Sequence, residues 1–165
     1  MIFRLLTIFF LLPISAADLS TALLNNQLHK NYTFIERSLS KTNLKIEEST
    51  GNILFDGSGL TVNVFTPFKE IYRLEGDKVE IHDLFLDQKQ VIDLNQANNF
   101  FLNILLNGVE DGSTEYSLKY LNNSIEVVPV DGSPKLIFVF VETKLGLIRY
   151  TDSIGVEHGI ELTGI

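Results

Sequence analysis

Most of the sequence consists of short runs in which apolar and polar residues alternate, the period-two pattern of β-strands with one buried face. The run Leu60-Thr61-Val62-Asn63-Val64 shows this alternation most clearly, and residues 78–82 repeat it. Turn-forming residues separate the runs, as in Glu75-Gly76-Asp77. The pattern predicts strands over residues 31–39, 44–47, 51–56, 60–64, 68–74, 78–82, 88–94, 116–120, 125–130, 136–141, 147–151 and 160–163.

The connections between most of these predicted strands have the length of hairpins. Hairpins join antiparallel neighbours, whereas parallel neighbours need a crossover of about a dozen residues or more. We therefore expect a mainly β fold with a single, strongly curved antiparallel sheet that forms an incomplete β-barrel. The run Leu136–Val141 is apolar at every position, which predicts a central strand with other elements packed over both of its faces.

Two segments show helical spacing instead. Residues 18–30 begin with an acidic residue and a hydroxyl residue that are suited to an N-cap. In residues 95–107, Asn95 can cap the start, and Gly108 is placed for a left-handed C-cap. We expect two to three helices packed against the sheet. The apolar stripe of the second helix comprises Ala97, Phe100, Phe101, Ile104 and Leu105.

The composition fits this architecture and excludes several functions. A chain of 165 residues with 45% hydrophobic residues has the size and composition of one globular domain. The formal charge of −8 leaves no basic surface for phosphates, so we expect no nucleic-acid partner. The absence of cysteine excludes zinc–thiolate sites, redox pairs and thiol nucleophiles.

The N-terminal residues have the features of a cleavable signal peptide. Arg4 gives a positive start, Leu5–Ile14 is almost entirely apolar, and Ser15-Ala16-Ala17 supplies small residues before a cleavage site. The apolar run is shorter than the ~20 residues of a membrane span, and an uncleaved anchor is the alternative. We expect residues 1–17 to be removed and residues 18–165 to form one domain in a bacterial periplasm.

No residue pattern indicates catalysis. P-loop, G-x-G-x-x-G and G-x-S-x-G motifs are absent, and Gly57-Ser58-Gly59 joins two strands rather than a strand and a helix. Neighbouring carboxylates such as those at positions 47 and 48 are expected on a solvated face. We expect a protein that is not an enzyme, with no catalytic residue, metal or cofactor. The histidines, which are not spaced as metal ligands and are expected at the surface, are His29, His82 and His158.

The aromatic content indicates binding rather than catalysis. The chain has twelve Phe and five Tyr. A curved sheet with few helices leaves a concave face that can form a hydrophobic cavity, with residues 95–107 as its lid. The alternative is that these side chains complete a closed core, and the sequence leaves open which sheet face lines the cavity. The candidate cavity and lid residues are Phe55, Val62, Val64, Tyr72, Phe100, Phe101, Ile104, Leu105, Phe138 and Phe140.

Three stretches are similar to motifs of one protein family. Residues 51–55 (GNILF) are close to a G-x-L-x-F/Y strand, residues 72–83 are close to L-x-x-D/E-G-D-x-L-x-I-Y-D, and Leu86-Asp87-Gln88 matches an L-x-Q step. Through these motifs, and best over residues 44–94, the sequence resembles the periplasmic outer-membrane lipoprotein carriers, the LolA-like family.

The resemblance implies an incomplete barrel with a helical lid over a cavity that holds the acyl chains of a lipoprotein or a related lipid. It also implies a monomeric carrier that accepts cargo from an inner-membrane ABC transporter and delivers it to an outer-membrane receptor. The family's Arg-Pro pair, whose Arg is linked to lid closure, is replaced here by Asp56-Gly57-Ser58-Gly59, so its gating mechanism is not carried over. A periplasmic sensor or regulatory domain of the same fold, which binds a protein partner or a lipid signal, is the alternative.

Export can be tested directly. N-terminal sequencing of the periplasmic protein should begin at Asp18, because a signal peptidase would cut after the small residues of Ser15-Ala16-Ala17. A chain that begins at Met1 and stays in the membrane fraction would contradict this prediction.

Overall fold

Eleven strands and two helices make up the described part of the chain, residues 18–42, 44–57, 59–94 and 99–165 of a computed structural model. The predicted signal peptide lies outside these residues. The helices are α1 (Thr21–Leu28) and α3 (Phe100–Asn107). The strands are β1 (Tyr32–Ser40), β2 (Lys45–Phe55), β3 (Gly59–Thr66), β4 (Glu70–Glu75), β5 (Lys78–Asp83), β6 (Gln88–Asp93), β7 (Tyr116–Tyr120), β8 (Ser124–Pro129), β9 (Leu136–Val141), β10 (Lys144–Thr151) and β11 (Val156–Gly164).

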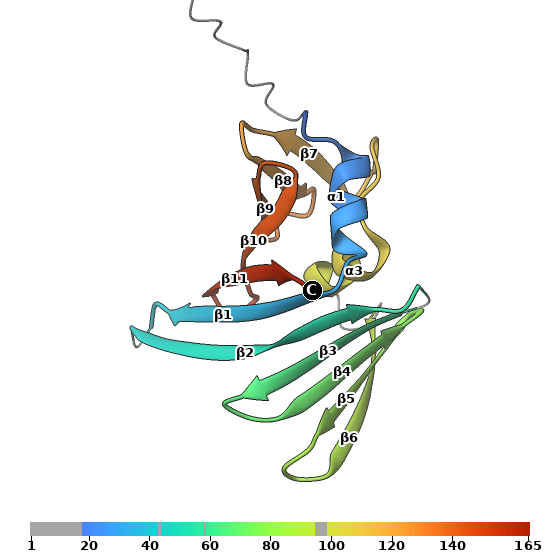
Figure 1. Cartoon of the computed structure of the whole chain (residues 1–165). Helices are drawn as coiled ribbons and strands as arrows, with labels where there is room; N and C mark the ends of the chain where they lie inside the picture. The colour runs from blue at the N-terminus through green and yellow to red at the C-terminus, as the bar shows by residue number, and fades with distance from the viewer. Residues whose placement is uncertain (1–17, 43, 58, 95–98) are drawn as a thin grey trace, which may run out of the picture.

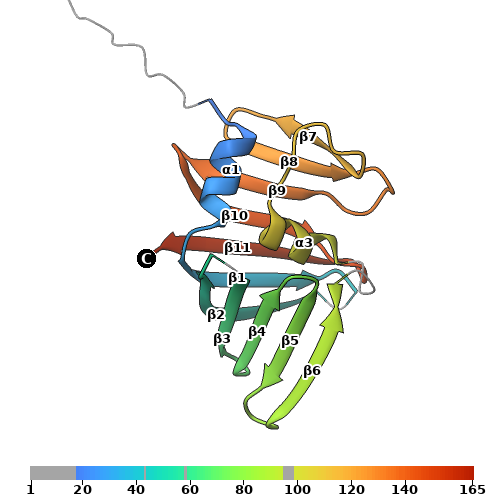
Figure 2. The ribbon, with the colours of Figure 1, turned by 90° about the vertical axis from the view of Figure 1, so that its right-hand side faces the viewer.

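All eleven strands belong to one sheet with the order β6-β5-β4-β3-β2-β1-β11-β10-β9-β8-β7. Every neighbouring pair is antiparallel. The sheet is not closed, and its edges are β6 and β7. Figure 1 shows the sheet curving around the helices, and Figure 2 shows α1 and α3 on the same, concave side. The predictions of a single antiparallel sheet and of helices packed against it are confirmed.

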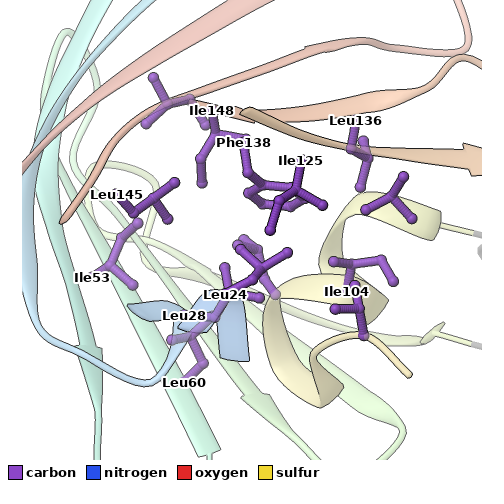
Figure 3. Close-up of a cluster of buried hydrophobic side chains, with 14 of the residues drawn as sticks. Leu24, Leu28, Ile53, Leu60, Ile104, Ile125, Leu136, Phe138, Leu145 and Ile148 are labelled. Carbon is purple, nitrogen blue, oxygen red and sulfur yellow. The ribbon is translucent and has the colours of Figure 1, made fainter. Parts of the chain in front are cut away.

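The strand register separates a concave face from a convex face. On β1, Phe34 lies opposite Gly51 of β2 and Leu162 of β11, and alternate residues from there share the concave face. Most of the buried core lies where α1 covers β8 to β10, with Leu24 of α1 beside Phe138 and Ile125 (Figure 3). Within the described residues, no helix is long and apolar enough to cross a membrane.

Strand β2 is longer than the sequence pattern predicts. Residues 44–47 and 51–56 were expected as two strands, but Lys45–Phe55 is continuous. The polar stretch around Ser49 resembles a turn because it lacks apolar alternation. On the concave face, Ser49 lies opposite Glu36 of β1, which is also polar. The Ser49 hydroxyl donates a hydrogen bond of 3.0 Å to the Glu36 carboxylate.

The prediction for residues 136–141 is partly wrong. Strand β9 is interior in the sheet, between β8 and β10, but only its concave face is covered. Phe138 is fully buried, whereas Val141 on the convex face is 69% exposed and Val139 is half-buried. An apolar run therefore marked an interior strand without marking a second covering layer.

Helix α1 is fixed to the sheet by two side-chain amides. The Gln27 side-chain oxygen accepts hydrogen bonds from the Tyr32 hydroxyl at 3.1 Å and from the Leu145 backbone N–H at 3.3 Å. The Asn25 amide makes two bonds to the backbone of Val109, of 2.9 and 2.8 Å. These bonds join α1 to β1, to β10 and to the segment that follows α3.

Helix α3 begins later than the sequence pattern predicts. Its N-cap is Asn99, whose side chain accepts from the Leu102 N–H at 3.1 Å, and the expected cap Asn95 lies outside the described residues. Gly108 ends the helix, but with φ 74° and ψ −158° it is not the expected left-handed helical cap. A Cβ at Gly108 would lie 2.5 Å from the Asn25 side-chain oxygen, so both its backbone conformation and its contact with α1 require glycine.

Replacing Phe138 should be the costlier of two changes on one strand. Phe138→Ala should lower the free energy of unfolding by about 3–5 kcal/mol, because it leaves a cavity in the buried core. Val139→Ala, on the convex face of the same strand, should cost roughly 1 kcal/mol or less. Chemical denaturation measures both, and equal costs would contradict the assignment of β9's faces.

Candidate functional site

A pocket of about 510 Å³ lies between α3 and the concave face of the sheet. Its volume falls within the range of about 300–1,000 Å³ that is typical of small-molecule sites. Strands β1 to β4, β10 and β11 form its floor, α3 covers it, and residues of the β8–β9 and β10–β11 turns lie at its side. The lining apolar and aromatic side chains are Phe34, Ile53, Val62, Val64, Tyr72, Phe100, Phe101, Leu102, Leu105, Pro134, Leu136, Tyr150 and Ile160.

Six of the ten cavity residues proposed from the sequence line this pocket, namely Val62, Val64, Tyr72, Phe100, Phe101 and Leu105. The other four lie elsewhere. Ile104, Phe138 and Phe140 are buried in the core, each with 3% exposure or less. Phe55 stacks on His29, with ring centroids 4.4 Å apart.

Seven of the thirteen apolar and aromatic pocket residues were not among the candidates predicted from the sequence. Phe34 and Ile53 belong to apolar alternations that had been recognised, but the alternation does not show which strands curve beneath a helix. The sequence signal for this site is Glu36, which lies on the same face of β1 as Phe34 and Ser38. A carboxylate at such a position indicates a polar site inside the fold.

Three aromatic rings connect α3 to the sheet. Phe101 of α3 stacks on Tyr150 of β10, with centroids 4.2 Å apart and planes at 14°. Tyr150 stacks in turn on His158 of β11, at 4.4 Å and 4°. Next to them, Phe100 meets Tyr116 edge to face at 5.8 Å. The helix therefore contacts the pocket floor through ring faces, each worth about 0.5–1.5 kcal/mol beyond its buried area.

His158 is held between two carboxylates in the pocket wall. Its Nδ1 lies 2.7 Å from Glu36, and its Nε2 lies 3.4 Å from Asp152. The side chain is only 16% exposed, and that of His82 only 17%, so the surface positions expected for these two histidines are wrong. His29 alone of the three is exposed, beside Phe55.

The surroundings of Glu36 and His158 favour the charged form of each side chain. Burial by itself raises the pKa of Glu36, but hydrogen bonds from His158 and Ser49 and the charge of His158 bring that pKa below its ordinary value. Burial by itself lowers the pKa of His158, but hydrogen bonds to Glu36 and Asp152 and their charges raise it overall. Glu36 and His158 therefore form a partly buried ion pair between their ordinary pKa values of 4.5 and 6.5.

The arrangement is not that of a metal centre or a nucleophile. The carboxylates occupy opposite nitrogens of the His158 ring, so the three groups do not converge on one point. Within the described residues no cluster of His, Asp and Glu is suited to a metal ion. The nearby Ser49 hydroxyl donates to Glu36 rather than to the imidazole. What the residues do form is an apolar pocket with one acidic, hydrogen-bonding wall.

The fold and the site together define a class of half-open antiparallel sheets that cover an apolar pocket with a helix. The outer-membrane lipoprotein carrier protein of Dechloromonas aromatica (strain RCB) is 29% identical over 134 residues, which are 78% of this chain and 64% of the relative. This chain thus covers less than two thirds of that relative's length. No protein-family model matches the chain.

Two solved structures are similar to this chain, and the first of them shows the same fold. The LolA superfamily protein from Nitrosomonas europaea superposes with a TM-score of 0.50 at 11% identity, over 89% of this chain and 92% of its own. A conserved protein from Thermus thermophilus superposes with a TM-score of 0.47 at 8% identity, over 87% and 85%. The resemblance seen in the sequence is confirmed: the chain is similar in sequence to an outer-membrane lipoprotein carrier protein and in fold to a LolA superfamily protein.

The ion pair predicts a defined dependence of stability on pH. His158, with a raised pKa, contributes stability that is complete below its ordinary pKa of 6.5 and is lost as the pH rises through its folded-state pKa. Glu36, with a lowered pKa, contributes stability that is present above its ordinary pKa of 4.5 and is lost as the pH falls through its folded-state pKa. The pair therefore stabilises most between these two ordinary values.

Urea denaturation of the wild type and of Glu36→Gln should show this window. The difference in unfolding free energy should reach about 1 kcal/mol between pH 4.5 and 6.5 and shrink on both sides. Glu48→Gln on the convex face, where Glu48 is 53% exposed beside Arg37, is the control and should show a small, flat difference. A Glu36→Gln difference that does not vary with pH would contradict the assignment.

Proposed function

We propose that this protein is a periplasmic carrier that binds the acyl chains of lipoproteins, or of a related lipid, and carries them between the inner and outer membranes. The observation that carries the proposal is the apolar pocket beneath α3, in a chain that is LolA-like in sequence and fold. An acyl chain gains about 0.8 kcal/mol for each buried methylene, so such a pocket suits a lipid tail.

Helix α3 is the part of the pocket that would move. Phe100 and Phe101 line the pocket and contact the neighbouring rings of Tyr116 and Tyr150, and neither phenylalanine is fully buried. Ile104 faces away from the pocket into the core and would serve as the anchor of the helix. In the empty state the rings cover the concave face, and incoming acyl chains replace them on Tyr150 and the strands.

The partners follow from the similarity to lipoprotein carriers. An inner-membrane ABC transporter would load the carrier, and an outer-membrane receptor would unload it. Transfer requires that binding be reversible, so the contacts of α3 must be of the same order as those of the cargo. The protein would act as a monomer after removal of residues 1–17.

A sensor or regulatory domain of the same fold is the second candidate, and exposed apolar turns favour it. Phe68 in the β3–β4 turn is 69% exposed, and Phe85 in the β5–β6 turn is 84% exposed. The two turns are joined by a hydrogen bond of 3.0 Å from the Leu84 N–H to the Lys69 carbonyl oxygen. A stable complex with a membrane regulator and no transfer of cargo would favour this candidate over the carrier.

Binding of an uncharged fluorescent probe tests the carrier function. N-phenylnaphthylamine should bind the wild type, and Phe101→Asp should weaken binding at least about tenfold, because it places a carboxylate in an apolar pocket. Phe68→Asp is the matched control, since Phe68 is exposed outside the pocket, and it should bind like the wild type. Circular dichroism should show both variants folded.

The outcomes separate the parts of the proposal. A wild-type protein that binds no apolar probe overturns the carrier function. If Phe101→Asp unfolds while Phe68→Asp does not, α3 is a fixed part of the core and the movable lid is wrong.

A further inference from the structure

On three strands the concave face changes from apolar to acidic. Each of these strands has two successive residues on the concave face, one apolar or aromatic and the other acidic. The apolar or aromatic residue lies toward the pocket, and the acidic residue lies toward the turns. Glu70 and Asp83 lie directly opposite each other on β4 and β5. The pairs are Phe34 and Glu36 on β1, Tyr72 and Glu70 on β4, and Ile81 and Asp83 on β5. Asp152, just after β10, adds a carboxylate to the pocket wall.

The basic residues of the strands lie almost entirely on the other face. The exception is Lys45 at the start of β2. On the convex side, Arg37 binds Glu48 and Glu161 at 3.0 and 2.7 Å. The strand residues with convex parity are Arg37, Arg73, Lys78, Lys89, Lys119, Lys144 and Arg149. Of the described residues that line the pocket, none is Lys or Arg, so His158 is the one source of positive charge among them.

The carboxylates on the concave side act on the two tyrosines of the pocket. Burial, followed by the charges of Glu36 and Asp152, raises the pKa of the Tyr150 hydroxyl. Burial and the neighbouring Glu70, together with Glu36 and Asp83, do the same to the pKa of Tyr72, whose hydroxyl donates to Glu70 at 2.6 Å. An anionic group in the pocket would therefore lie beside the carboxylates of Glu36 and Asp152, with His158 to offset them.

We propose, on the basis of the carrier function, that this acidic wall selects the head group of the ligand, so that the pocket accepts amphiphiles with an ammonium head group and rejects those with a carboxylate. The apolar floor takes the chain, and Glu36 and Asp152 face the head group. Each carboxylate has about four acceptor positions. Glu36 uses one oxygen for His158 and the other for Ser49, which leaves lone pairs for an ammonium donor.

Rejection of the wrong charge matters as much as attraction of the right one. A carboxylate head group placed beside the carboxylates of the pocket would be repelled in a partly desolvated site. The specificity of the pocket is the difference between its affinity for the ammonium amphiphile and its affinity for the carboxylate amphiphile. Tyr150 supplies a neutral hydroxyl beside the carboxylates, so an uncharged polar head group should rank between the two ionic ones.

Three amphiphiles with the same dodecyl chain test the proposal at neutral pH. Dodecylammonium, monododecanoylglycerol and dodecanoate compete with N-phenylnaphthylamine for the wild-type protein, below their micelle concentrations. Dodecylammonium should displace the probe at a concentration at least about tenfold lower than dodecanoate does, with the glycerol ester between them. In the double variant Glu36→Gln, Asp152→Asn the ratio should fall to about threefold or less, with each competition referred to that variant's own affinity for the uncharged probe.

Glu48→Gln is the matched control, because it removes one carboxylate from the convex face of β2, and it should keep the wild-type ratio. If no apolar compound binds, the carrier function fails and this inference fails with it. If the compounds bind but dodecanoate equals dodecylammonium, or if the ratio survives in the double variant, the head-group inference is wrong and the carrier function stands. Should the double variant unfold, Asp152→Asn by itself must lower the ratio, and an unchanged ratio overturns the proposal.

Discussion

The pairing of the first strand with the last determines where everything else in this fold can lie. Strands β1 and β11 pair along their whole length, from Tyr32 opposite Gly164 to Ser40 opposite Val156. The first and last strands thereby occupy the middle of the sheet, and β6 and β7, which follow each other in the sequence, become its opposite edges. Helix α3 lies between these two strands in the sequence and packs over the pocket on the concave face.

This topology gives the two halves of the concave face different tasks. Where α1 covers β8 to β10, side chains such as Phe138 fill the space completely. Helix α3 contacts β10 and β11 through stacked rings. Between the helix and β1 to β4, the curved sheet leaves the pocket open. The same apolar composition therefore produces a closed core at one end and a pocket at the other, and curvature rather than hydrophobicity makes the difference.

Period-two alternation predicted nearly all the strands, because each strand has one covered face. It failed where the covered side is itself polar, as at Ser49 on β2. The site was predicted in part for a related reason. Val62 and Phe101 carry the apolar signal that marks a pocket wall, but Phe138 carries the same signal and is core. His158 is far in the sequence from the carboxylate on β1 that it binds, and only the pairing of β1 with β11 brings the two together.

The resemblance to lipoprotein carriers implies an arginine linked to lid closure, and the contacts of α3 show what holds the helix without one. At the end of β2, Asp56 accepts a hydrogen bond of 2.8 Å from the Gly59 N–H and so closes a local turn, while α3 meets the sheet through Phe101, Tyr150 and His158. An aromatic contact of this kind contributes about 0.5–1.5 kcal/mol, which one or two buried methylenes of an acyl chain would offset. On the proposed function, a lid held by stacked rings opens in proportion to the apolar surface that replaces it, without a charged bond to break. On this function the ion pair of Glu36 and His158 has a separate role. It orients the His158 ring, on which Tyr150 stacks, and it holds the Glu36 carboxylate in the pocket wall.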